Sequence, residues 1–203
     1  MGKRIAYFDC FSGASGDMLL GALLDAGLEL EDLRSDLAAL EVGGYELAVN
    51  RQARHGISGS KFDVLDRGGE RPARHLETVR KLIEGSSLPP EVIAQGVRVF
   101  ERLAQAEAAV HGTTIENVHF HEVGAVDALV DIVGFCCAIR RLGIETLYSS
   151  PLPLGNGTVR TEHGLLPVPA PATLALLASA GAPTLPSQAE AELVTPTGAA
   201  LLT

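Results

Sequence analysis

The chain of 203 residues contains no tryptophan, and Phe, Trp and Tyr together make up only 4% of it. Stacking of bases or sugars on aromatic side chains is therefore not expected to be its main mode of binding. The formal net charge is −9, which argues against a nucleic-acid partner because phosphate binding needs clustered Lys and Arg. No apolar run is long enough to span a bilayer, and the N-terminus reaches Asp9 too early for a signal peptide.

Cysteine is also scarce, with only Cys10, Cys136 and Cys137. These three residues form no CxxC metal-ligand pair and no even disulfide framework, which fits a reducing cytosol. We therefore predict a cytoplasmic protein without a membrane segment. The hydrophobic content of 46% and the charged content of 20% are typical of a chain that folds around a core.

Strand and helix patterns alternate along the sequence and predict an α/β fold, a mixed sheet flanked by helices. A helical segment is expected over about residues 75–111. Strands are expected at residues 5–9, 45–52, 61–65 and 118–122, and helices at residues 18–26, 30–40, 75–84, 90–111, 126–142 and 172–180. The first strand is expected to be buried, the second and third to pair through residues 55–59, and residues 66–73 to form a linker.

The densest group of polar side chains combines His119, His121, Glu122, Asp127 and Asp131 among apolar neighbours. On a strand, the two histidines point the same way. On a helix, the two aspartates lie four residues apart on one face. Such a set suits a borderline divalent metal such as nickel or zinc. The alternative is structural, with imidazoles at a strand end and carboxylates on a solvated helix face, but buried carboxylates are rare unless paired or ligating.

A small-residue turn follows the first strand and has the strand, glycine-rich loop and helix order of an anion-binding site. Its candidate binding residues are Ser12, Gly13, Ser15, Gly16 and Asp17. The turn lacks the spacing of a P-loop or of a dinucleotide site, so a plain tight turn is an equal alternative. Asp9 ends the strand where α/β sheets place their ligands, and we expect it to be functional and close to the histidine and aspartate cluster.

Two further segments supply candidate residues near the C-terminus. Thr195, Thr197 and Gly198 open the last expected helix with hydroxyl and N–H groups, which suits a phosphate or oxyanion, although simple N-capping explains them as well. His163 precedes a glycine and is either a third imidazole for the metal or a turn residue.

Four stretches in this order resemble the LarC family, whose members insert nickel into the pincer cofactor of lactate racemase. They are residues 9–18 (DCFSGASGDM), residues 119–132 (HFHEVGAVDALVDI), residues 152–157 (LPLGNG) running on to residues 163–172 (HGLLPVPAPA), and residues 192–198 (ELVTPTG). The resemblance extends from Ile5 to the last residue.

The resemblance implies a nickel-inserting cyclometallase of the lyase class. Its substrate is pyridinium-3,5-bisthiocarboxylic acid mononucleotide, on which nickel–sulfur and nickel–carbon bonds form with consumption of CTP and help from a divalent cation. Family members carry a further C-terminal domain associated with nucleotide use, so residues 1–203 are expected to be the N-terminal nickel-insertion domain, incomplete as a fragment. The C-terminal domain and a lactate racemase-type acceptor are the expected partners. A non-enzymatic nickel carrier and a zinc-dependent hydrolase are the rival functions.

Within this family, we expect His119 and His121 to be the first nickel ligands. Asp127 or Asp131 would be an oxygen ligand or would orient an imidazole. Glu122 would be the base that removes the pyridinium ring proton before the nickel–carbon bond forms.

Overall fold

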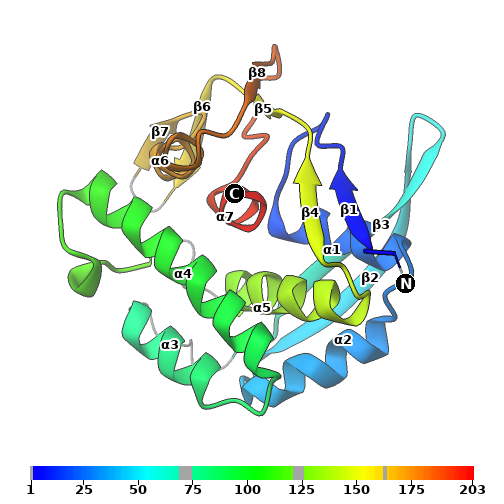
Figure 1. Ribbon diagram of the computed structural model, residues 1–203. Coiled ribbons are helices and arrows are strands. Elements are labelled where there is room, and N and C mark those ends of the chain that lie inside the picture. Colours follow the sequence, from blue (N-terminus) through cyan, green and yellow to red (C-terminus); the bar gives the residue numbers. More distant parts are fainter. Residues whose placement is uncertain (1, 69–74, 121–125, 162–163) are drawn as a thin grey trace.

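The computed structural model describes residues 2–68, 75–120, 126–161 and 164–203. Within these residues, helices and short strands alternate along the chain, which confirms the α/β class (Figure 1). The strands described form four separate two-stranded sheets, so the single mixed sheet expected from the sequence is replaced by four small ones. None of the described helices combines the length and apolar character needed to cross a membrane.

The helices are α1 (Gly16–Asp25), α2 (Leu30–Leu37), α3 (Leu76–Glu84), α4 (Pro90–His111), α5 (Val126–Arg141), α6 (Pro171–Ala180) and α7 (Pro196–Leu202). Single 3₁₀ turns lie at Ala38–Leu40 and Ile115–Asn117. The strands are β1 (Ile5–Phe8), β2 (Tyr45–Arg54), β3 (Ile57–Asp66), β4 (Thr146–Ser149), β5 (Leu152–Leu154), β6 (Thr158–Thr161), β7 (Gly164–Pro167) and β8 (Thr184–Pro186). β1 pairs with β4 and β5 with β8 in parallel, whereas β2–β3 and β6–β7 are antiparallel hairpins.

The hydrophobic core forms around α5, which packs against α1, α2, α4 and α7 (Figure 1). Most of the residues of α5 are buried, including Cys136 and Cys137. A helix that is apolar on nearly all sides needs neighbours on all sides. In its first two turns, Asp127 is exposed and Asp131 is half-buried, so this end of the helix carries carboxylates beside the core.

The helical segment over residues 75–111 is confirmed as α3 and α4. Pro90 occupies the first turn of α4, where its missing N–H group removes no helical hydrogen bond, and Gly112 ends the helix in the left-handed conformation. Val79 and Ile83 of α3 are buried, and this helix packs against α4.

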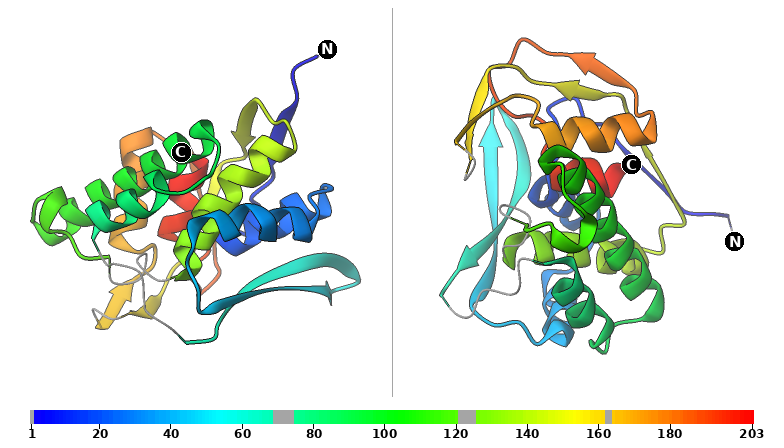
Figure 2. Two further views of the ribbon diagram at one scale, coloured as in Figure 1. Left: turned by 90° about the horizontal axis from the view of Figure 1, so that it is seen from below. Right: turned by 90° about the vertical axis from the view of Figure 1, so that its left-hand side faces the viewer.

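The expected pairing of the second and third strands is confirmed, but the hairpin is longer than predicted. β2 and β3 pair from Tyr45 with Asp66 to Arg54 with Ile57, so the turn consists of only His55 and Gly56. Both turn residues have positive φ, as a two-residue hairpin turn requires. The hairpin lies along one side of the molecule, with β3 against α1 (Figure 2). Asp66 belongs to β3, which shortens the expected linker at its start.

Two further strand predictions need correction. Residues 5–9 were expected to be buried, yet Ile5 is 58% exposed and Tyr7 is 63% exposed. Among the described strands β1 pairs with β4 alone, and the face of β1 that carries these two side chains is left open. Residues 118–122 were expected to form a strand, but residues 118–120 belong to none, and the other two lie outside the described residues. Val118 and Phe120 are buried and His119 between them is exposed, so this segment still alternates.

Candidate metal site

Two loops that are far apart in the sequence meet directly in the fold. The N–H of Ala14 donates to the carbonyl of Leu193 (2.9 Å), and the N–H of Thr195 donates to the carbonyl of Ala14 (3.1 Å). At Gly198, a Cβ atom would overlap with the carbonyl of Ala14, so only glycine permits this approach. The glycine-rich turn and the segment over residues 192–198 therefore form one structural unit.

The first turns of α1, α5 and α7 face a common cavity of about 360 Å³ beside β3. Its lining residues are Ser15, Gly16, Asp17, Phe62, Asp63, Val64, Asp127, Asp131, Glu192, Thr195, Pro196 and Thr197. Seven of these were predicted as site residues from three separate motifs, namely Ser15, Gly16, Asp17, Asp127, Asp131, Thr195 and Thr197. The fold thus brings together parts of the N-terminal, central and C-terminal motifs.

Carboxylates dominate the lining of this cavity, and no Lys or Arg is among its lining residues. Lys61 forms an ion pair with Asp63, and the hydroxyl of Ser15 donates to Asp17. The N-termini of α1 and α5 contribute positive dipole ends that favour nearby carboxylates. Even with these partners, the carboxylates of Asp17 and Asp127 give the cavity a negative field that favours a cation and opposes a free phosphate.

Among the described groups that line the cavity, the carboxyl group of Asp131 has the largest pKa shift. Burial raises the pKa of its carboxyl group to about 8, and the neighbouring carboxylates of Asp17 and Asp127 add to the effect. Its Oδ1 atom is buried without a hydrogen-bond partner in the described part of the protein. Gly16 has no room for a side chain, because a Cβ atom there would lie 2.6 Å from Cβ and Cγ of Asp131. The aspartate therefore depends on a glycine at the start of α1.

The carboxylates do not form a complete coordination sphere by themselves. Across the described residues, no three His, Cys, Asp or Glu side chains are placed to hold one metal ion. A divalent ion in this cavity would therefore retain water or take ligands from a substrate or from other parts of the chain. Oxygen ligands and retained water are common for hard and borderline divalent ions.

The backbone amides of the two loops have partners inside the protein. The N–H of Gly13 donates to the carbonyl of Cys10 (2.9 Å), and the N–H of Gly198 donates to the hydroxyl of Thr195 (3.1 Å). Thr195 is thus the N-cap of α7, which was the alternative interpretation of this motif. These contacts leave Gly13 and Gly198 without an N–H group for a phosphate.

Other predicted residues are not among the lining residues or lie outside the described part of the chain. Asp9 and Ser12 are exposed and are not among the lining residues. His119 is also outside the lining, and its ring lies against that of His75, with centroids 4.0 Å apart. His121, Glu122 and His163 lie outside the described residues, and their predicted roles stay predictions.

Three residues with suitable chemistry were missed at the level of the sequence. Asp63 lies in β3, where its alternation with Phe62 looked like an ordinary half-buried strand. Glu192 opens one of the four motifs but was given no role. His75 gives no signal in the sequence, because nothing local indicates its contact with His119, 44 residues later.

The profile of the family described as "Nickel insertion protein" matches residues 6–203. The chain belongs to this family. A protein of Thermomicrobium roseum named "Putative nickel insertion protein" is 56% identical over 200 residues, and a protein of the same name from Roseiflexus castenholzii is 54% identical over 199 residues. The "Pyridinium-3,5-bisthiocarboxylic acid mononucleotide nickel insertion protein" of Desulfitobacterium hafniense is 52% identical over 200 residues.

Each of these alignments covers 98% of the chain but only 49% or 50% of the relative. The chain therefore spans about half the length of the curated relatives that it matches. No solved structure shows a significant match. Membership of the nickel insertion protein family agrees with a cavity whose charge favours cations.

Proposed function

We propose that this nickel insertion protein inserts Ni²⁺ into pyridinium-3,5-bisthiocarboxylic acid mononucleotide, and that the acidic cavity receives the ion. The Asp131 carboxyl group carries this proposal, because it is buried beside two other carboxylates and its pKa is raised to about 8. Such a group holds a proton at neutral pH where a divalent cation could replace it. The name of the Desulfitobacterium hafniense relative supports the choice of substrate.

In this proposal Asp131 and Asp127 supply oxygen ligands from one face of α5, water or substrate completes the coordination, and Asp17 at the start of α1 adds negative charge nearby. Binding of Ni²⁺ releases the proton of Asp131, so affinity rises with pH up to about 8. The substrate carries phosphate and thiocarboxylate groups, which the empty carboxylate cluster repels. We therefore infer that Ni²⁺ binds first and that the anionic substrate follows.

The His75 and His119 pair is the proposed imidazole contribution to nickel capture. Two rings with centroids 4.0 Å apart come from the N-cap of α3 and from the segment after the 3₁₀ turn at Ile115–Asn117. Imidazole nitrogens suit nickel better than calcium or magnesium. His121 and Glu122 precede α5 in the sequence and keep their predicted roles as nickel ligand and as base for the ring proton.

The decisive experiment measures conversion of the mononucleotide in a single turnover. Protein, Ni²⁺ and substrate are mixed with and without CTP, and the nickel-containing product is identified by its mass and nickel isotope pattern. Asp131→Asn should abolish or strongly reduce product formation. Exposed Asp32→Asn, on α2 outside the cavity, serves as the control with the same change of side chain. Equal product yields from the two variants, at the level of the wild type, would exclude the cavity as the insertion site.

The wider reaction includes predictions that belong to the whole protein. Consumption of CTP with a divalent cation, delivery to a lactate racemase-type acceptor and a cytoplasmic location follow from the family resemblance alone. Comparing CTP consumption by this chain with that of a relative of full length tests the first of these. Metal analysis after purification without chelators distinguishes nickel from zinc.

A further inference from the structure

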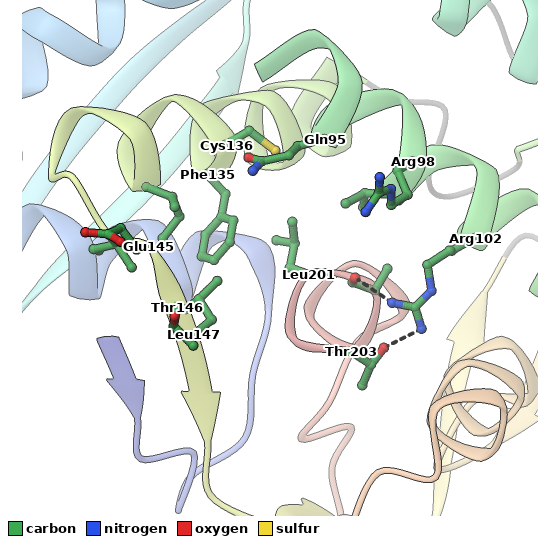
Figure 3. Close-up of a pocket in the computed structure, with 14 residues that line it drawn as sticks. Gln95, Arg98, Arg102, Phe135, Cys136, Glu145, Thr146, Leu147, Leu201 and Thr203 are labelled. Atoms are coloured by element: carbon green, nitrogen blue, oxygen red, sulfur yellow. Dashed lines mark hydrogen bonds between the residues drawn. The ribbon is translucent and has the colours of Figure 1, made fainter. Parts of the chain in front are cut away.

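A second cavity of about 270 Å³ lies between α4, α5, α7 and the segment that enters β4 (Figure 3). It shares no lining residue with the acidic cavity. The two cavities also differ in charge, because this one contains two arginines. Its ligand is therefore expected to differ in chemistry from the cation assigned to the acidic cavity.

One end of this cavity is basic. Arg98 and Arg102 are four residues apart on α4, so both lie on the same face of the helix (Figure 3). Arg102 donates to the hydroxyl of Thr203 (2.8 Å) and to the carbonyl of Ala200 (3.5 Å), which fixes its guanidinium group. Arg98 has no hydrogen-bond or ion-pair partner among the residues that the structure describes. Its N–H groups are available to a ligand.

The remaining walls are mainly apolar. Phe135 and Ile139 come from α5, Leu147 from β4 and Leu201 from α7, and Figure 3 shows the ring of Phe135 and the side chain of Leu201 beside the same space. The carboxylate of Glu145 lies at the end away from the arginines. A ligand would thus meet positive charge at one end and hydrocarbon along its length.

We propose that this cavity binds a small organic anion, a carboxylate or a phosphate ester with an aromatic or other apolar body. Arg98 and Arg102 hold the anionic group, and Phe135 and Leu201 contact the body. An arginine fork matches the two oxygen atoms of either anion. The volume is slightly below the range of about 300–1,000 Å³ typical of drug-sized ligands, which suits a ligand with one ring better than a nucleoside triphosphate. The inference does not depend on the proposed nickel chemistry.

Phenyl phosphate and benzoate are suitable probes, and inorganic phosphate tests the charge alone. Binding is measured by NMR titration of the purified protein, of Arg98→Gln, and of Arg54→Gln as a control. Arg54 is exposed on β2, outside the cavity, and undergoes the same loss of charge. We expect at least one aromatic probe to bind the wild type, with affinity about tenfold or more lower in Arg98→Gln and unchanged in Arg54→Gln.

Two further measurements separate the role of the arginine fork from that of the apolar contacts. Arg98→Lys keeps the charge but loses the fork, so its affinity should fall between those of the wild type and Arg98→Gln. Inorganic phosphate should bind more weakly than phenyl phosphate, because it cannot contact Phe135 or Leu201. The inference is wrong if neither aromatic probe binds the wild type, if Arg98→Gln and Arg54→Gln weaken binding equally, or if inorganic phosphate binds as tightly as phenyl phosphate.

Discussion

Replacing Asp131 by Asn should make the protein more stable at alkaline pH while it weakens nickel binding. The folded state raises the pKa of the Asp131 carboxyl group from its ordinary value near 3.8 to about 8. Between these two values the folded protein keeps a proton that the unfolded chain releases. Unfolding therefore becomes easier as the pH rises, and the contribution that is complete below pH 3.8 is lost by about pH 8.

The magnitude follows from the width of this pH window. Each pH unit corresponds to about 1.4 kcal/mol, so a window of about four units sets a ceiling of about 5–6 kcal/mol. Burial is the main cause of the shift, and water entry and small movements of Asp17 and Asp127 reduce its cost, so we expect about 2–4 kcal/mol. Asn has nearly the same shape as Asp and does not titrate, so its variant avoids this loss.

Urea unfolding followed by circular dichroism at pH 5, 6.5 and 8 measures the effect. The free energy of unfolding of Asp131→Asn should exceed that of the wild type most at pH 8 and least at pH 5. Asp63→Asn is the control, because Asp63 lines the same cavity but is paired with Lys61, so its loss should bring no gain. A difference between Asp131→Asn and the wild type that does not change with pH would refute the assignment of a raised pKa to Asp131.

Three further outcomes are expected. Calorimetry in buffers of different ionisation enthalpy should show that Ni²⁺ binding releases protons and tightens from pH 6 to pH 8 in the wild type but not in Asp131→Asn. Gly16→Ala should weaken Ni²⁺ binding and lower the denaturation midpoint, because the new methyl group displaces the Asp131 side chain, whereas Gly43→Ala, with no atom near its added Cβ, should do neither. His75→Ala and His119→Ala should each weaken Ni²⁺ binding about 10–100-fold. The exposed control His55→Ala should leave the affinity unchanged, and equal affinities for all three variants would show that the pair does not bind nickel.

Local patterns predicted much of the secondary structure. The period of apolar residues, Pro90 and Gly112 together define α4, and the run of apolar residues after Val126 defines α5. The sheet arrangement could not be predicted in the same way, because strand pairing joins distant residues. Ile5 and Thr146, for example, pair across 141 positions, and no property of either strand alone specifies this partner or the exposed face that results.

In the candidate site, too, residues with a local signal in the sequence were identified, whereas residues that reach the cavity only through distant contacts were not. Asp127 and Asp131 were identified because charged residues are costly on an otherwise apolar helix, and the structure places both at the acidic cavity. Asp63 gave no such signal, since a charged residue on a hairpin strand is ordinary. Asp9 was assigned by the rule that ligands lie beyond the C-terminal ends of strands in open sheets. Among the described strands β1 has one partner, and Asp9 does not line the acidic cavity, so its functional role stays a prediction.

The surroundings of Asp131 do not stabilise its ionised carboxyl group. Its carboxyl group is buried without a partner for Oδ1, stands beside Asp17 and Asp127, and requires a glycine at the start of α1. A divalent cation reverses the unfavourable terms together, because it replaces the proton, compensates the neighbouring carboxylates and gives the buried oxygen a partner. Binding at a free concentration of about 100 times Kd contributes about 2.7 kcal/mol to the stability of the folded state, which is similar to the loss expected from ionising Asp131 alone. The surroundings of Asp131 therefore support the proposal that a cation binds at this carboxyl group.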